Sequence, residues 1–188
     1  MSQRRVTILL LCEDNQQVTF ARRFLQGVGW QNSDMRVILP VCGRGSGEQY
    51  VRENFIKWLS YYRQRRKRAA TIFIVMLDAD TSEVIERCHW LDKVCQDAKV
   101  ACRAPDEAVA FIIPKRNIET WIHYLAELHK NINETEQYPK LAKASNCKLA
   151  VQNLIRLCQT TGLPPEAPPS LRQACREYLE RIKSSALE

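Results

Sequence analysis

The sequence has no apolar segment of the roughly 20 residues that a membrane helix needs. One apolar run, Val6 to Cys12, follows two arginines as the core of a signal peptide does. It is too short for that role, lacks a small-residue cleavage site and runs directly into Glu13-Asp14. We therefore expect a cytoplasmic protein with no membrane partner.

CxxC pairs are also missing, although the chain contains eight cysteines. Their spacings do not fit a zinc site. Most of them fall on apolar positions of expected strands or helices, where a reduced cysteine packs as a small hydrophobe. We expect free thiols, as in other cytosolic proteins. The eight are Cys12, Cys42, Cys88, Cys95, Cys102, Cys147, Cys158 and Cys175.

Acidic residues are in the minority, 21 against 28 lysines and arginines, which gives a net charge of +7. Much of the excess lies in one run, from Arg63 to Arg68. A basic excess favours polyanionic partners, nucleic acid above all. The same run ends a long helical stretch, where cations offset the helix dipole and stay in solvent. The sequence leaves both interpretations open.

Acidic residues nevertheless gather at two informative places. Glu13-Asp14 follows the apolar run Val6 to Cys12, and Asp78-Ala79-Asp80 follows the run Thr71 to Leu77. Such runs are typical of strands buried on both faces of a parallel sheet, and ligands bind at the carboxyl ends of such strands. If the two strands are neighbours, three carboxylates meet. A cation would relieve their repulsion, and we expect Mg²⁺ or Mn²⁺ on Glu13, Asp78 and Asp80. Strand alternation would point Asp78 and Asp80 the same way if the strand continues that far.

Strand and helix patterns alternate through the first two-thirds of the chain. Further strands are expected over Met35–Cys42 and Ala108–Ile113. The alternation predicts right-handed crossovers and an α/β fold, with a compact parallel sheet of about four strands flanked by helices. We assign residues 1–130 to this domain and residues 131–188 to a helical extension packed on it. Ser170 caps the last expected helix, which presents as its inward face Ala174, Cys175, Tyr178, Leu179 and Ile182.

A glycine-rich turn separates the second strand from the long helix over Glu48 to about Arg68. Its residues are Gly43, Arg44, Gly45, Ser46 and Gly47. Such a strand-to-helix turn can hold a phosphate on its backbone N–H groups, which makes these five residues candidates for cofactor binding. The turn is not a Walker A loop, because the GK[ST] ending is absent. The alternative is that these glycines only allow the chain to turn and bind no phosphate.

The order of the acidic residues resembles that of the Toprim family. Glu13 follows the first strand, Asp78-x-Asp80 the third and Glu119 the fourth. The segment Arg116 to Trp121 looks like one in small Toprim-like proteins of mobile elements and phage defence. The resemblance covers roughly residues 5 to 125. Toprim domains commonly have glycine after the first glutamate, where this chain has Asp14.

The resemblance implies Mg²⁺-dependent chemistry on nucleic-acid phosphodiesters. It implies that Glu13 acts as general acid/base or metal ligand, that Asp78 and Asp80 bind metal and that Glu119 completes or steadies the site. Lys115, with Arg116, would hold developing charge nearby. The expected function is a DNA or RNA endonuclease. A non-catalytic Toprim-like subunit of a partner ATPase is the first alternative, and a small-nucleotide or phosphate binder using the glycine-rich turn is the second.

Overall fold

The computed structural model describes residues 6–41, 46–127, 131–159 and 162–183 of the chain. Within these residues, four strands form one parallel sheet in the order β2-β1-β3-β4. The strands are β1 Thr7–Leu11, β2 Met35–Ile38, β3 Thr71–Met76 and β4 Val109–Ile112. The expected α/β class and four-stranded parallel sheet are confirmed.

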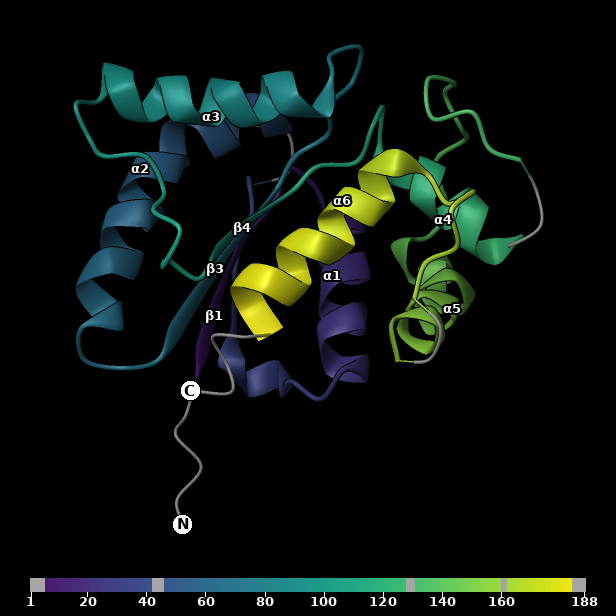
Figure 1. Ribbon diagram of the computed structural model, residues 1–188, viewed down its shortest axis with the longest axis horizontal. Helices are drawn as coiled ribbons and strands as arrows, with labels where there is room; N and C mark the ends of the chain where they lie inside the picture. The colour runs from purple at the N-terminus through teal and green to yellow at the C-terminus, as the bar shows by residue number, and fades with distance from the viewer. Residues whose placement is uncertain (1–5, 42–45, 128–130, 160–161, 184–188) are drawn as a thin grey trace.

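Six α-helices accompany the sheet in the described part of the chain (Figure 1). They are α1 Asn15–Gly27, α2 Gly47–Arg66, α3 Val84–Asp97, α4 Ile118–Ala126, α5 Lys148–Gln159 and α6 Pro169–Glu177. A π-helical turn, Tyr178–Lys183, continues α6, and 3₁₀ turns occupy Asn32–Asp34 and Ala144–Cys147. None of the described helices is long and apolar enough to cross a membrane.

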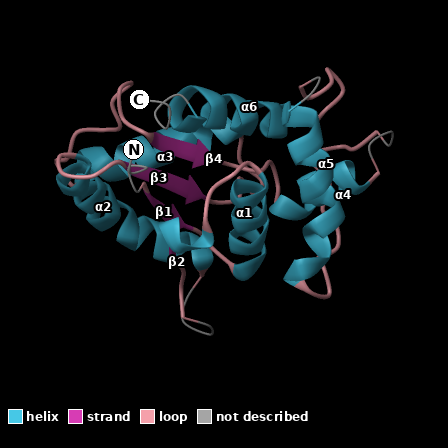
Figure 2. Ribbon diagram, turned by 90° about the horizontal axis from the view of Figure 1, so that it is seen from below, coloured by secondary structure: helices cyan, strands magenta, loops and turns pink. Residues whose placement is uncertain are grey.

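Helices cover both faces of the sheet (Figure 2), as its apolar strands require. All six residues of β3 are buried. On one face, Phe55 of α2 stacks on Phe73 and meets Phe111 edge-on. On the other face, α1 and α6 pack over Ile74 and Met76. The two central strands β1 and β3 are therefore fixed by packing from both sides, which fixes the residues that follow them.

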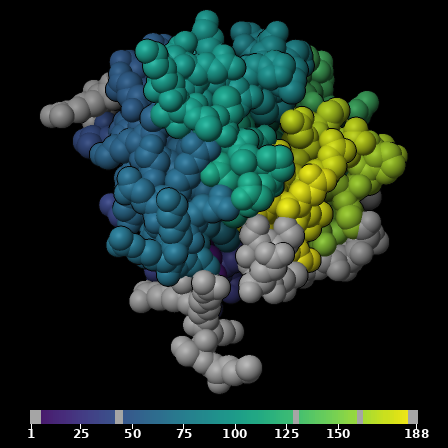
Figure 3. Space-filling model, turned by 60° about the vertical axis from the view of Figure 1, so that its left-hand side comes forward, coloured from purple at the N-terminus to yellow at the C-terminus, as the bar shows by residue number. Residues whose placement is uncertain are grey.

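The C-terminal helices share this core. Leu154, Leu171 and Ala174 are buried in the same apolar cluster as the strands. The prediction that Ser170 caps the last helix is wrong, because α6 begins at Pro169 and Ser170 lies inside its first turn. The hydroxyl of Ser170 instead accepts the indole N–H of Trp121 of α4 at 2.8 Å. In Figure 3 the yellow residues of α6 lie against teal residues that precede β4. An Arg103–Glu177 ion pair at 2.6 Å joins these segments.

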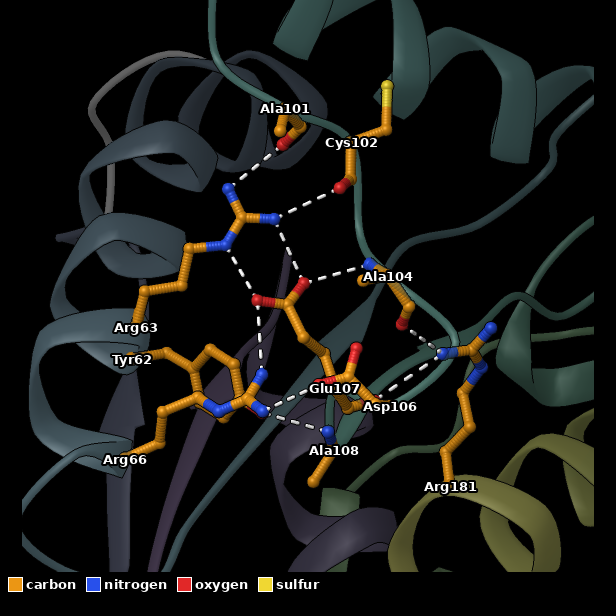
Figure 4. Close-up of polar contacts among 10 residues, drawn as sticks. All are labelled: Tyr62, Arg63, Arg66, Ala101, Cys102, Ala104, Asp106, Glu107, Ala108 and Arg181. Carbon is orange, nitrogen blue, oxygen red and sulfur yellow. Dashed lines mark hydrogen bonds and ion pairs between the residues drawn. The ribbon is translucent and has the colours of Figure 1, made fainter.

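The basic run at the end of α2 is divided between two environments. Arg63 and Arg66 turn towards the loop before β4, where both pair with the buried carboxylate of Glu107 at 2.7 and 3.3 Å (Figure 4). Arg66 also pairs with Asp106 at 2.8 Å, and the backbone N–H of Ala104 donates to Glu107. Two of the run's cations thus fasten α2 to the sheet. Arg65, Lys67 and Arg68 take no part in this cluster.

Candidate active site at the carboxyl edge of the sheet

The ends of β1 and β3 lie side by side. The two strands pair in parallel register, with Leu11 opposite Val75, so Glu13 and Asp78 follow at the same edge. The backbone N–H of Asp78 donates to Glu13 Oε2 at 3.0 Å. The expected convergence of these two carboxylates is therefore confirmed. We refer to them below as the Glu13–Asp78 pair.

One buried amide holds the pair together. Gln17 Nε2 donates to Asp78 Oδ1 at 3.0 Å and to Glu13 Oε2 at 3.3 Å, while Gln17 Oε1 accepts the backbone N–H of Glu13. Asp14 caps α1 by accepting the N–H of Gln17 at 2.9 Å, so the cap sets the position of the bridging residue. This role of Gln17 was not predicted from the sequence. The role could have been inferred from the position of Gln17, a polar residue that follows Glu13 by one helical turn and lies on the buried face of α1.

The pair has no ion-pair partner in the described residues, although the charge of Arg87 lowers the pKa of Glu13 in part. Both side chains are half-buried, and no lysine, arginine or histidine of the described chain forms an ion pair with either. Burial chiefly, and then the charge of Glu13, raises the pKa of Asp78 to about 8. Burial chiefly, with a contribution from the charge of Asp80, raises the pKa of Glu13 to about 7. Two carboxylates are thus held close together at a position that solvent reaches.

Asp80 does not join the pair in the way that strand alternation suggested. β3 ends at Met76, and Asp80 has a positive φ of 53°, so the chain has turned before it reaches this residue. Its backbone bridges to Arg116, and its carboxylate pairs with Arg87 at 3.2 Å. Arg87 also pairs with Glu48 at 3.0 Å, which links α3 to the start of α2 beside the site. Asp80 therefore lies at the border of the site, in an ion-pair network that the sequence analysis did not predict.

Glu119 and Lys115 occupy different surroundings. Glu119 is buried in the first turn of α4, and its pKa is raised by burial and by the charge of Asp14. Its own charge contributes to the raised pKa of Asp78, which places it within electrostatic reach of the pair. Lys115 is buried and donates to the carbonyl of Ser82 and to the carboxylate of Glu83, at 2.8 and 2.6 Å. Lys115 thus fastens the start of α3.

The glycine-rich turn is described only in part. Gly43, Arg44 and Gly45 lie outside the described residues. Ser46 caps α2 by accepting the N–H of Gln49 at 3.1 Å. Gly47 packs on Glu13, since a Cβ at this position would lie 2.6 Å from Glu13 Cβ and 2.7 Å from Glu13 O. A glycine is needed here because the start of α2 approaches the backbone of Glu13.

Gly47→Ala is expected to shift Glu13 and to destabilise the protein by about 1 to 3 kcal/mol, because overpacking against backbone is not relieved by a side-chain rotation. Thermal denaturation measures the loss of stability, and Mn²⁺ titration measures the effect on the site. Ser46→Ala is the matched control, since it removes a helix cap worth about 1 kcal/mol without touching Glu13. Equal Mn²⁺ affinity in the two variants would show that Gly47 does not position Glu13.

The donor set fits a hard divalent cation. Mg²⁺ often takes one or two protein carboxylates and keeps several waters, and the pair offers two adjacent carboxylates that form no ion pair within the described chain. No three His, Cys, Asp or Glu side chains among those described lie close enough to hold one ion. The expected three-carboxylate group is therefore not assembled here, and two carboxylates would have to suffice.

Comparisons of this chain with protein-family models, with curated proteins and with solved structures found no match.

Proposed function

We propose that this protein is a metal-dependent phosphodiester hydrolase that acts on nucleic acid. The observation that carries the proposal is the Glu13–Asp78 pair, two half-buried carboxylates bridged by Gln17 at the carboxyl edge of adjacent parallel strands. Ligands of open α/β sheets bind at this edge. The order of the acidic residues, similar to that of Toprim domains, and the net charge of +7 support a polyanionic substrate.

In this proposal Glu13 and Asp78 hold Mg²⁺ or Mn²⁺. When bound, the ion would neutralise the phosphate, activate a water and stabilise the leaving oxygen. Gln17 and the N–H of Asp78 keep the two carboxylates in place before the ion arrives, which lowers the cost of organising the site. The charge of Glu119 acts on Asp78, and the Asp80–Arg87–Glu48 network fixes the loop that borders the pair.

We further propose that the protein works in the cytoplasm, in keeping with free thiols at its seven described cysteines. DNA and RNA are both candidate substrates, since the phosphodiester that the ion would contact is common to both.

The test is a cleavage assay with the purified chain and labelled single- and double-stranded DNA and RNA. We expect cleavage with Mn²⁺ or Mg²⁺, none in EDTA, and a loss of at least about a hundredfold in Glu13→Gln, which removes a charged ligand but keeps its size. Glu83→Gln is the control, because Glu83 is an exposed partner of Lys115 outside the pair. Wild-type protein that cleaves none of the four substrates would contradict the proposal and favour a binding module without turnover.

A further inference from the structure

The end of α2 borders a basic hollow at the opposite edge of the sheet from the Glu13–Asp78 pair. Its volume is about 510 Å³, and its lining consists of Tyr61, Gln64, Arg65, Lys67, Arg68 and Ala69. Three of these six residues are cationic, and none is acidic. We call this feature the α2 hollow.

The cations of the α2 hollow differ from their neighbours in having no acidic partner among the described residues. Arg63 and Arg66 are neutralised by Glu107 and Asp106 (Figure 4). Arg65, one position away on another face of α2, instead donates to Tyr61 Oη at 3.5 Å and to Thr7 Oγ1 at 3.2 Å. Its Nε is buried and has no hydrogen-bond partner in the described structure.

Lys67 and Arg68 are exposed, and neither forms an ion pair within the described residues. The lining thus concentrates three uncompensated positive charges around one concavity. An anion with several charges, spaced to reach all three, is the ligand that this arrangement favours. Beside the hollow, Arg36 stacks over the buried Trp58 and over Tyr61 at 4.7 and 5.5 Å.

We propose that the α2 hollow binds the phosphate backbone of the nucleic acid on which the Glu13–Asp78 pair acts. The inference rests on the proposed function for its choice of polyanion. Beyond that function, it places a second nucleic-acid contact at the α2 hollow and gives the distance between the hollow and the Glu13–Asp78 pair.

That distance follows from α2 itself. The first residue of the helix, Gly47, packs on Glu13, and its last residue, Arg66, is followed directly by Lys67 and Arg68 of the hollow. Twenty residues in an α-helix span about 30 Å. A duplex that follows α2 covers this length with about nine base pairs, at about 3.4 Å per pair. A shorter duplex cannot touch both places at once.

The experiment compares the triple variant Arg65→Gln, Lys67→Gln, Arg68→Gln with wild type. Fluorescence anisotropy in EDTA, which stops metal-dependent cleavage, measures the affinity for a duplex of about 16 base pairs as a function of salt. We expect a loss of roughly tenfold to hundredfold in affinity and a salt dependence lower by about two to three counterions. With saturating metal, the same variant should cleave this duplex more slowly at low substrate concentration, whereas cleavage of a hairpin of about six base pairs should change little.

The matched control replaces three exposed cations outside the hollow, Lys93, Lys99 and Arg176, by glutamine, which removes the same net charge. Both triple variants should keep the circular dichroism and melting temperature of wild type. Equal loss of affinity in the two variants would overturn the proposal, because it would show that the lower net charge alone weakens binding. Unchanged affinity in the hollow variant would also overturn it, as would tighter binding of anionic lipid vesicles than of the duplex.

The outcomes separate this inference from the proposed function. If only the hollow variant loses binding and wild type does not cleave, nucleic-acid binding by the α2 hollow is supported and the proposed hydrolase activity is contradicted. Metal-dependent cleavage by wild type, with normal binding by the hollow variant, would support the hydrolase and overturn the hollow.

Discussion

Asp78→Asn is expected to stabilise the metal-free protein at pH 8 to 9 while removing its response to divalent metal. The pKa of Asp78 is raised to about 8, chiefly by burial and next by the charge of Glu13. A carboxyl group whose folded-state pKa is raised contributes stability that is present below its unfolded pKa of about 4 and is lost as the pH rises through 8. Asparagine keeps the acceptor for Gln17 and has no such titration.

Because the pKa of Asp78 rises from about 4 to about 8, the expected gain in the free energy of unfolding is up to about 5 kcal/mol above pH 8, where Asp78 is ionised in wild type, and close to zero at pH 4. Denaturant unfolding at both pH values, in EDTA and in excess Mn²⁺, measures it. Bound Mn²⁺ should stabilise wild type at pH 8 and should leave Asp78→Asn nearly unchanged. Asp80→Asn is the control, since Asp80 is exposed and paired with Arg87. A clear loss of stability in metal-free Asp78→Asn at pH 8 would assign Asp78 a structural role.

Glu107→Gln is expected to have the opposite effect, a loss of about 3 kcal/mol in stability at neutral pH, because it breaks a buried ion pair from one side. Burial by itself would raise the pKa of Glu107, but hydrogen bonds from Arg63 and from the N–H of Ala104 outweigh it and hold the pKa below its usual value. The carboxylate therefore stabilises the fold above about pH 4, and this stability is lost as the pH falls through its lowered pKa.

Asp106→Asn is the matched control for Glu107. Asp106 pairs with the same Arg66 at 2.8 Å, but its side chain is 72% exposed, so its replacement should reduce stability far less than Glu107→Gln does. Denaturant unfolding at pH 7 compares the three proteins. Equal, small effects in the two variants would show that Arg63 and Arg66 do not fasten α2 through Glu107. The two carboxylates, Asp78 and Glu107, thus provide opposite pH signatures within one protein.

The sheet and the pair were predictable because long-range order in a parallel sheet follows from local patterns. Two apolar runs of sufficient length had to be central strands, and central parallel strands end at one edge. The position of Asp80 was not predictable in this way. It depends on where β3 stops and on a left-handed residue in the following loop, and no periodicity in the sequence marks either.

The ion-pair partners of charged residues could not be predicted from the sequence either. Nothing in the run from Arg63 to Arg68 distinguishes Arg63, which pairs with a glutamate 44 positions away, from Arg65, which has no acidic partner in the described part of the chain. The C-terminal helix gives a further example. The expected inward face is correct for Ala174 and Ile182, but Leu179 is 44% exposed. The backbone changes from α to π geometry at Tyr178, and this change shifts the helical phase for the residues that follow.

The most direct test of the central claim is a crystal structure of the protein soaked with Mn²⁺, with anomalous difference density measured at the Glu13–Asp78 pair. We predict one strong peak within ligand distance of a Glu13 and an Asp78 oxygen, and no such peak in Asp78→Asn crystals treated in the same way. A wild-type map with Mn²⁺ at other sites and no peak at the pair would contradict the claim that these two carboxylates form the metal centre.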